Sequence, residues 1–326
     1  MLDVVFTGDL RKVGTALLYM CVFLLVIAAV MYRLDAVLAR GRRSRRWHVA
    51  VFLGPAVLLL CLGLAFPMLR TLYLSFFDAA GRQFVALDNY VWIFTDPETL
   101  LMLRNTLLWV VCVPLASTAI GILYAVLVTD ARRERIANSL IFMPMAISFV
   151  GAAIIWKFIY AYRAPEDEQI GLLNELIVRL GGEPQQFLSN TPGNTFFMIV
   201  MLVWIQAGFA AVVISAAIKG IPADVAEAAR LDGADARQMF WWVTMPTIRP
   251  TIVVVVMTIT VATLKVFDIV RTSTGGQFKS SVLALEVYNQ SFRADNIGRG
   301  AALAVLLFAL VVPIAAFQLR RLRRNA

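Results

Sequence analysis

Histidine and cysteine, which commonly bind metals or take part in nucleophilic catalysis, are scarce in this chain, and those present are scattered. His48 is the single histidine, and Cys21, Cys61 and Cys112 lie far apart among aliphatic neighbours. A metal site needs clustered ligands, and isolated cysteines in apolar segments usually serve packing. The sequence therefore predicts neither a catalytic site nor a metal site.

Three charged side chains, Lys157, Lys265 and Asp268, lie within apolar stretches. An ionisable group inside a membrane segment is costly, so such groups are commonly functional. Lys265 and Asp268 are three residues apart, and in a continuous helix they would share one face. They could line a polar path for a solute or form a structural ion pair. Lys157, near the end of its stretch, could instead extend its amine to the interface.

Aromatic and amide side chains near the ends of these stretches are suited to binding a sugar. Aromatic rings supply an apolar face, and amides hydrogen-bond to hydroxyl groups. Alternatively, single aromatic residues anchor a helix at the membrane interface. The candidates are Trp204, Gln206, Phe209, Asn289, Gln290 and Phe292.

The elements that must position these residues are membrane helices. The chain is 60% hydrophobic and 16% charged, with a mean hydropathy of +0.77. Soluble domains are about 45–50% apolar and about 25% charged, so soluble enzymes and disordered proteins are excluded. The composition indicates an all-α polytopic membrane protein, because a helical span takes about 20 apolar residues. Seven apolar runs are expected to be spans, at 13–32, 50–69, 106–128, 139–160, 196–218, 250–270 and 299–319.

Basic residues indicate the orientation of these spans. The segments 33–49, 129–138, 219–249 and 320–326 carry 17 Lys and Arg residues, against 10 in the opposite set. Short basic loops stay in the cytoplasm, so we expect the amino terminus outside and the carboxyl terminus inside. The basic excess then favours anionic lipid as a partner and not nucleic acid. Residues 1–32 lack the basic start of a signal peptide, which favours a retained first helix.

The loop at about 219–249 has the pattern of two short helices joined by a turn. Pro222 and Asp224 favour a helix start, and Gly233 is a natural stop. A second amphipathic stretch is expected to end at Pro246, before the next span. Such a loop on the cytoplasmic side is suited to binding another cytoplasmic protein.

Glu227-Ala228-Ala229, then Gly233, and then Met245-Pro246 give this loop a recognisable spacing. It resembles the EAA loop of ABC importer permeases, although the usual ending is Leu-Pro. Further segments resemble the carbohydrate branch of that family, and the combination looks closest to α-glucoside permeases. These segments are Asp88–Tyr90, Asn105-Thr106, Trp156, Gly171–Asn174, Gly181–Pro184, Trp204, Gly208-Phe209, Phe267-Asp268 and Thr274–Gly276.

The resemblance implies a six-helix type I importer core at 50–326, preceded by an extra transmembrane helix and basic linker at 1–49. It also implies half of a permease in a bacterial cytoplasmic membrane. Its partners would be a second permease subunit, an ATPase dimer that grips the EAA loop, and an external solute-binding protein. The sequence contains no Gly-x-x-x-x-Gly-Lys-Ser/Thr loop, so ATP and Mg²⁺ would be bound by the ATPase partner, with no cofactor in this chain.

Three other interpretations remain open at this point. The chain could be a permease of the same family for a non-sugar solute, such as a peptide or an amino acid. An ion-coupled secondary transporter would usually show paired broken helices in two related halves, and a membrane-embedded enzyme would need clustered acids or histidines. Within the sugar interpretation, maltose, sucrose, trehalose and glucosylglycerol all remain possible.

Overall fold

A computed structural model describes residues 45–128 and 134–325, and before them 14–15, 18–22, 25, 28–30 and 32–33. The chain divides into two units, Met1–Arg70 and Thr71–Ala326. The expected first span at 13–32 and the basic run at 40–46 fall largely outside the described residues, although those described between 14 and 33 are helical. The first unit then continues through α2 (Arg45–Leu60) and the π-helical η1 (Cys61–Ala65), and it ends within α3 (Phe66–Leu74). The stretch Leu53–Leu74 is long and apolar enough to span a membrane.

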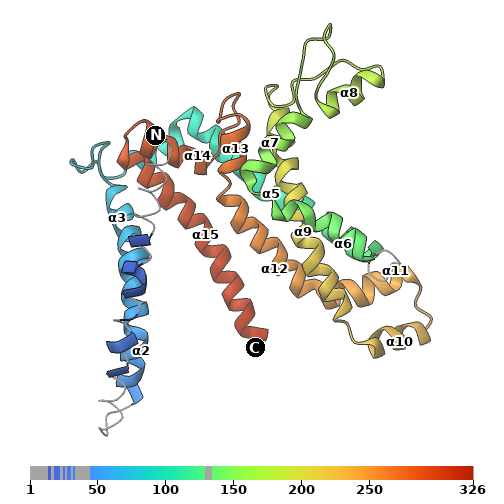
Figure 1. Cartoon of the computed structure of the whole chain (residues 1–326), viewed down its shortest axis with the longest axis horizontal. Coiled ribbons are helices and arrows are strands. Elements are labelled where there is room, and N and C mark those ends of the chain that lie inside the picture. Colours follow the sequence, from blue (N-terminus) through green and yellow to red (C-terminus); the bar gives the residue numbers. More distant parts are fainter. Residues whose placement is uncertain are drawn as a thin grey trace. The chain divides into compact units, whose positions relative to one another are not determined.

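The second unit is helical throughout its regular elements. Figure 1 shows α8 at one end of this unit and α10 at the other, and these are called the α8 end and the α10 end below. The elements α13 and α14 lie toward the α8 end. In chain order the elements are α4 (Asp88–Thr95), α5 (Pro97–Val128), α6 (Glu134–Phe142), the 3-10 turn η2 (Met143–Ala146), α7 (Phe149–Ile159), α8 (Leu172–Arg179), α9 (Gly193–Lys219), α10 (Ala223–Leu231), α11 (Ala236–Gln238), the π-helical η3 (Met239–Thr244), α12 (Met245–Leu264), α13 (Asp268–Ser273), α14 (Leu283–Tyr288), the π-helical η4 (Asn289–Arg293) and α15 (Ile297–Asn325).

Helix α9 is the central and most buried span of this unit. It packs along α5 and also contacts α12, α6 and η2. A Cβ atom on Gly121 of α5 would lie 2.6 Å from the Cβ of Ala210, and one on Gly208 would lie 2.4 Å from the carbonyl oxygen of Ile141. Small residues at such crossings allow helix backbones to approach closely, which is how membrane helices gain packing contacts.

The expected continuous span at 139–160 is wrong, because the structure breaks this helix. Residues Glu134–Ala146 and Phe149–Ile159 form two helical segments that meet at an angle of 105°. Pro144 lacks a backbone N–H and lies within η2, and Ser148 starts α7 by accepting a hydrogen bond from the N–H of Gly151 at 3.1 Å. A proline followed by a strong N-cap favours a break over a straight helix. Five helices of the described chain are long and apolar enough to span a membrane, or six if this bent pair counts as one.

The expected span at 250–270 also differs from the structure. Helix α12 ends at Leu264, and α13 begins at Asp268. Lys265 and Asp268 therefore do not share the face of one helix, and within the described residues they form no ion pair. At its other end, α12 continues from Ala236 without interruption, so the expected end at Pro246 is wrong. The π-helical turn η3 precedes Pro246, and it changes the hydrogen-bond register where that proline supplies no N–H.

Candidate coupling loop and solute path

Helix α10 presents the Glu227-Ala228-Ala229 segment at one end of the unit. The side chains of Glu227 and Ala228 are exposed, and that of Ala229 is half-buried. Leu231 is 89% exposed and Val225 is 45% exposed on the same short helix. An apolar side chain this exposed on a nine-residue helix has no core of its own to bury it. The helix therefore offers apolar contact area beside an acidic side chain.

The end of α10 is fixed by a glycine turn, as the sequence predicts. Gly233 has φ +83°, and its N–H donates to the carbonyl of Arg230 at 3.0 Å. The N–H of Ala234 donates to the carbonyl of Ala229, also at 3.0 Å. The next helix begins with a capping box, in which Asp235 accepts from the N–H of Gln238 at 2.7 Å and the Gln238 side chain accepts in return at 2.9 Å. These bonds fix the path of the chain between the two helices.

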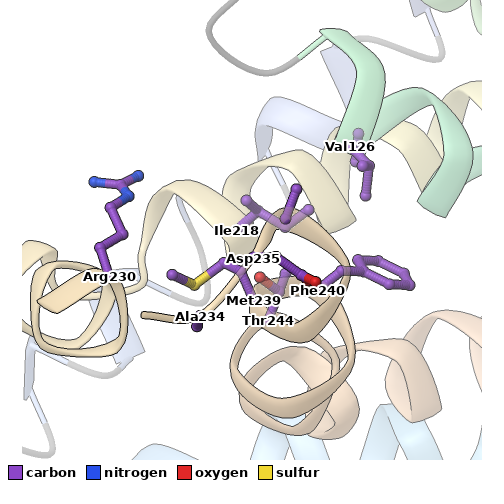
Figure 2. Close-up of a pocket in the computed structure, with 10 residues that line it drawn as sticks. Val126, Ile218, Arg230, Ala234, Asp235, Met239, Phe240 and Thr244 are labelled. Atoms are coloured by element: carbon purple, nitrogen blue, oxygen red, sulfur yellow. The ribbon is translucent and has the colours of Figure 1, made fainter. Parts of the chain in front are cut away.

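A cavity of about 410 Å³ separates α10 from the ends of the spans. Its lining includes Val126 of α5, Ile218 of α9, and Met239 and Phe240 of η3. Figure 2 shows Ile218, Met239, Phe240 and Thr244 gathered together, with Arg230 set apart on α10. Among the described elements, η3 is the main neighbour of α10, and on this side a cavity takes the place of a packed core.

A polar network ties three spans together near the α10 end. Lys219, the last residue of α9, forms an ion pair with Glu134 of α6. Asn138 of α6 donates to Glu134 at 3.3 Å and accepts a hydrogen bond from the hydroxyl of Tyr124 of α5 at 2.6 Å. This network was not predictable from the sequence, because the residues that form it come from distant segments. Only Glu134 and Asn138 have helical spacing.

At the α8 end, three residues predicted to contact the solute, Asn289, Gln290 and Phe292, lie together with residues that the sequence did not single out for this role. The carboxylate of Glu286 accepts from Gln290 at 2.7 Å and from Asn289 at 3.2 Å. The ring of Tyr288 lies 5.3 Å from that of Phe267 and 5.5 Å from that of Phe292, and the Arg271 guanidinium lies 5.0 Å from the Tyr288 ring. We call this group the Tyr288 cluster, consisting of Phe267, Arg271, Glu286, Tyr288, Asn289, Gln290 and Phe292.

Within the Tyr288 cluster, Glu286 is 8% exposed, and Oδ1 of Asn289 is buried without a hydrogen-bond partner among the described residues. The Glu286 and Gln290 spacing of four residues was the available signal for the hydrogen-bonded pair.

The remaining predicted residues lie outside this cluster. Trp204 of α9 meets Trp156 of α7 edge to face, with ring centroids 5.8 Å apart. Lys157 is exposed, and its amine donates to the carbonyl of Thr272 in α13 at 3.4 Å. Phe209 packs against the main apolar core, and Gln206 is half-buried on α9. Helix α13, which carries Arg271 of the Tyr288 cluster, contacts both α7 and α9.

Two known proteins match this sequence over most of its length. The osmoprotective compounds uptake permease protein GgtC of Synechocystis sp. is 49% identical over 273 residues, covering 84% of this chain and 98% of that protein. The alpha-glucoside transport system permease protein AglF of Rhizobium meliloti is 45% identical over 333 residues, covering 97% and 99%.

The fold is that of a solved ABC transporter chain. A chain in the crystal structure of a bacterial alginate ABC transporter, in complex with an alginate pentasaccharide-bound periplasmic protein, superimposes with a TM-score of 0.73. It shares 22% identity and covers 86% of this chain and 96% of its own length. Residues 117–324 match the family of binding-protein-dependent transport system inner membrane components. This confirms the resemblance carried by the EAA loop: the chain belongs to that family, the non-catalytic, cofactor-free, multi-pass permease subunits of ABC importers.

Proposed function

We propose that this chain forms half of the translocation path of an ATP-driven importer for α-glucosides or similar oligosaccharides. The observation that carries this proposal is the 45% identity to the alpha-glucoside permease AglF over 97% of the chain. The match covers 97% of the chain, so it includes the ends of the spans, where the candidate sugar-binding side chains lie. The chain would pair with a second permease subunit and receive its sugar from an external binding protein.

Coupling is assigned to the loop at about 219–249. Glu227, Ala228 and Ala229 would contact the ATPase dimer, which binds ATP and Mg²⁺. The exposed apolar area of α10 supports this role, as does the cavity behind it, because α10 can receive a partner without disturbing a packed core. Gly233 would set the angle of α10, and Met245 and Pro246 would begin the span that carries its displacement onward. In this arrangement the α10 end and the carboxyl terminus are cytoplasmic, and residues 1–49 form an extra helix and linker before the permease domain at 50–326.

The Tyr288 cluster is proposed as part of the solute path. It contains three neighbouring aromatic rings, two amides and a carboxylate. The rings can pack against the apolar faces of a sugar, and the amides and the carboxylate can hydrogen-bond to its hydroxyl groups. Its half-buried state fits a site that is completed when the spans move. Further wall residues of the same path would be Lys157, Trp204, Gln206, Phe209, Lys265 and Asp268.

The central test measures ATPase activity of the complete transporter in lipid nanodiscs. The binding protein would be added empty or loaded with maltose, sucrose, trehalose or glucosylglycerol. We expect a loaded binding protein to raise the rate by about tenfold or more, since coupling free energies of about 1–3 kcal/mol change equilibria by factors of about 5–150. Stimulation by a peptide-loaded binding protein, with none by a sugar-loaded one, would refute the sugar assignment. Uptake driven by a proton or sodium gradient without ATP would refute the ATP-driven mechanism.

A specific alternative is an osmoprotective solute, favoured by the 49% identity to GgtC. The same experiment distinguishes the two, provided that a non-sugar osmoprotectant, glycine betaine, is added to the solutes tested. Stimulation by a loaded sugar and not by glycine betaine would support the α-glucoside class.

The turn after α10 gives a second prediction. Replacing Gly233 with tryptophan puts a side chain on a residue at φ +83°. Non-glycine residues in this left-handed conformation cost about 1–2 kcal/mol. No atom lies within 4 Å of the new Cβ, so at that atom the strain is conformational and not a clash. We expect normal abundance in the membrane and uptake lowered by about tenfold or more. The matched control is Gly220→Ala, because Gly220 has φ −77°. Normal uptake by the Gly233→Trp transporter at wild-type abundance would contradict the assigned role.

A further inference from the structure

The turn between α13 and α14, Thr274–Ser281, holds a run of residues in the left-handed conformation. Gly275 and Gly276 have φ values of +65° and +85°, and glycine adopts such values readily. Phe278 and Lys279 have positive φ values of 54° and 57°. Residues with a side chain rarely adopt this conformation, and here two do so in succession. The turn is therefore not held in place by its own conformational preference.

Two buried asparagines from other helices hold the turn at these two residues. Asn194 of α9 donates from Nδ2 to the carbonyl of Phe278 at 2.7 Å. Asn105 of α5 donates from Nδ2 to the carbonyl of Lys279 at 2.8 Å and to that of Ser281 at 3.0 Å. Each asparagine is 1% exposed. Both strained non-glycine residues thus have their carbonyl oxygens held by a side chain from a different span.

The turn joins the two elements that carry the Tyr288 cluster. Arg271 lies on α13, whereas Glu286 and Tyr288 lie on α14. The 5.0 Å contact between the Arg271 guanidinium and the Tyr288 ring therefore depends on how the turn is placed. A cavity of about 420 Å³ lies on one side of the turn, lined by Gly276, Lys279 and Ser281 and by residues of α5. This cavity gives the turn room to shift on that side when the asparagine hydrogen bonds are lost, although the turn keeps its internal bond between the hydroxyls of Thr274 and Ser280 at 2.6 Å.

We propose that Asn105 and Asn194 are positioning residues for solute passage, which set the geometry of the Tyr288 cluster through the Thr274–Ser281 turn. The proposal rests on the proposed role of that cluster in the solute path. Neither asparagine contacts the solute itself. Each holds the backbone of the turn, and the turn places the Arg271 side chain against the face of Tyr288.

The first test is hydrogen–deuterium exchange on the complete transporter in nanodiscs. Asn105→Leu and Asn194→Leu keep a similar volume and remove the donor, so exchange of the backbone amides at 275–283 is expected to speed up by about tenfold for a lost hydrogen bond. Asn174→Leu is the matched control. Asn174 is fully buried and donates to the carbonyls of Ala161 and Gln185, so its loss should affect the α8 region and leave this turn unchanged. Unchanged exchange in the turn would overturn the proposal.

The second test separates positioning from simple structural support. The half-saturating concentration of sugar-loaded binding protein, measured by ATPase stimulation, is expected to rise about tenfold in Asn105→Leu, with little change in the maximum rate per assembled complex. The sugar is whichever of maltose, sucrose and trehalose stimulates the wild-type transporter most. A fall in the maximum rate alone, with an unchanged half-saturating concentration, would show a merely structural role.

A rescue experiment tests the strain itself. Lys279→Gly removes the left-handed strain while keeping the carbonyl, so the double variant Asn105→Leu/Lys279→Gly should return toward the wild-type half-saturating concentration. Failure of this rescue would overturn the proposal. If Asn105→Leu does not assemble, Asn105→Ala provides the same comparison, because alanine also lacks the donor and is small enough for the buried position. If the wild-type complex shows no stimulated ATPase, the proposed function fails, whereas the exchange comparison still reports on the turn.

Discussion

Replacing Glu227 with lysine is expected to lower binding-protein-dependent uptake by about a hundredfold or more, because charge reversal in a protein interface costs several kcal/mol. Glu227 is exposed on α10, and its side chain makes no hydrogen bond or ion pair with the described residues. The substitution therefore leaves the fold of this chain intact. The loss should arise at the contact with the ATPase dimer. We therefore expect the loaded binding protein no longer to raise the ATPase rate above its basal value.

The measurement is uptake of labelled sugar into proteoliposomes, with the amount of bound ATPase determined in parallel. The control is Glu168→Lys, which makes the same change of charge on an exposed residue outside the coupling loop. Uptake should stay near wild type in that control. Uptake by Glu227→Lys within about threefold of the control would show that the acidic side chain is not part of the coupling contact, since threefold is below about 1 kcal/mol.

Adding one methyl group at Gly121 is expected to have the largest effect on stability. The new Cβ would lie 2.6 Å from Cβ of Ala210 and 2.8 and 2.9 Å from backbone atoms of Ala210 and Ala211. Carbon atoms prefer a separation of about 3.5–4.0 Å, so α5 and α9 must move apart. Overpacking of this kind costs about 1–3 kcal/mol. Because α9 is the most buried span, its displacement affects every helix that packs on it.

The result to measure for Gly121→Ala is the yield and thermal midpoint of the purified complex in detergent. Gly193→Ala is the matched control, because a Cβ there meets its nearest atom at 3.8 Å, an ordinary contact. Adding Ala210→Gly to Gly121→Ala should restore only part of the stability, since the two backbone contacts remain. A Gly121→Ala complex as stable as the Gly193→Ala complex would mean that α5 and α9 are not in this close contact.

Features set by local chemistry were predictable from the sequence. Within the described residues, hydropathy located five of the seven expected spans. Gly233 marked the end of α10, because a left-handed turn favours a residue without Cβ. The break between α6 and α7 was missed because hydropathy is insensitive to a bend inside an apolar stretch. Pro144 and Ser148 were the available signals, and both have common uses in straight helices or loops.

The grouping of the candidate solute residues was only partly predictable, because tertiary contacts bring them together. Asn289, Gln290 and Phe292 were predicted from their residue types, and they do lie together. The pairing of Lys265 with Asp268 failed, since a break in the helix separates them. The contribution of Arg271 was missed because it approaches Tyr288 across a turn that two distant asparagines hold.

The bend between α6 and α7 also has a consequence for biogenesis. Helix α6 with η2 has nine and four residues, and α7 has 11. Neither segment reaches the roughly 20 residues that a helix needs to cross a bilayer alone. A bent backbone at membrane depth must be covered by protein or water. Its cover is α9, whose Gly208 lies against the carbonyl of Ile141. During synthesis both segments leave the ribosome before α9 does, so we expect them to complete their insertion only after α9 has been synthesised.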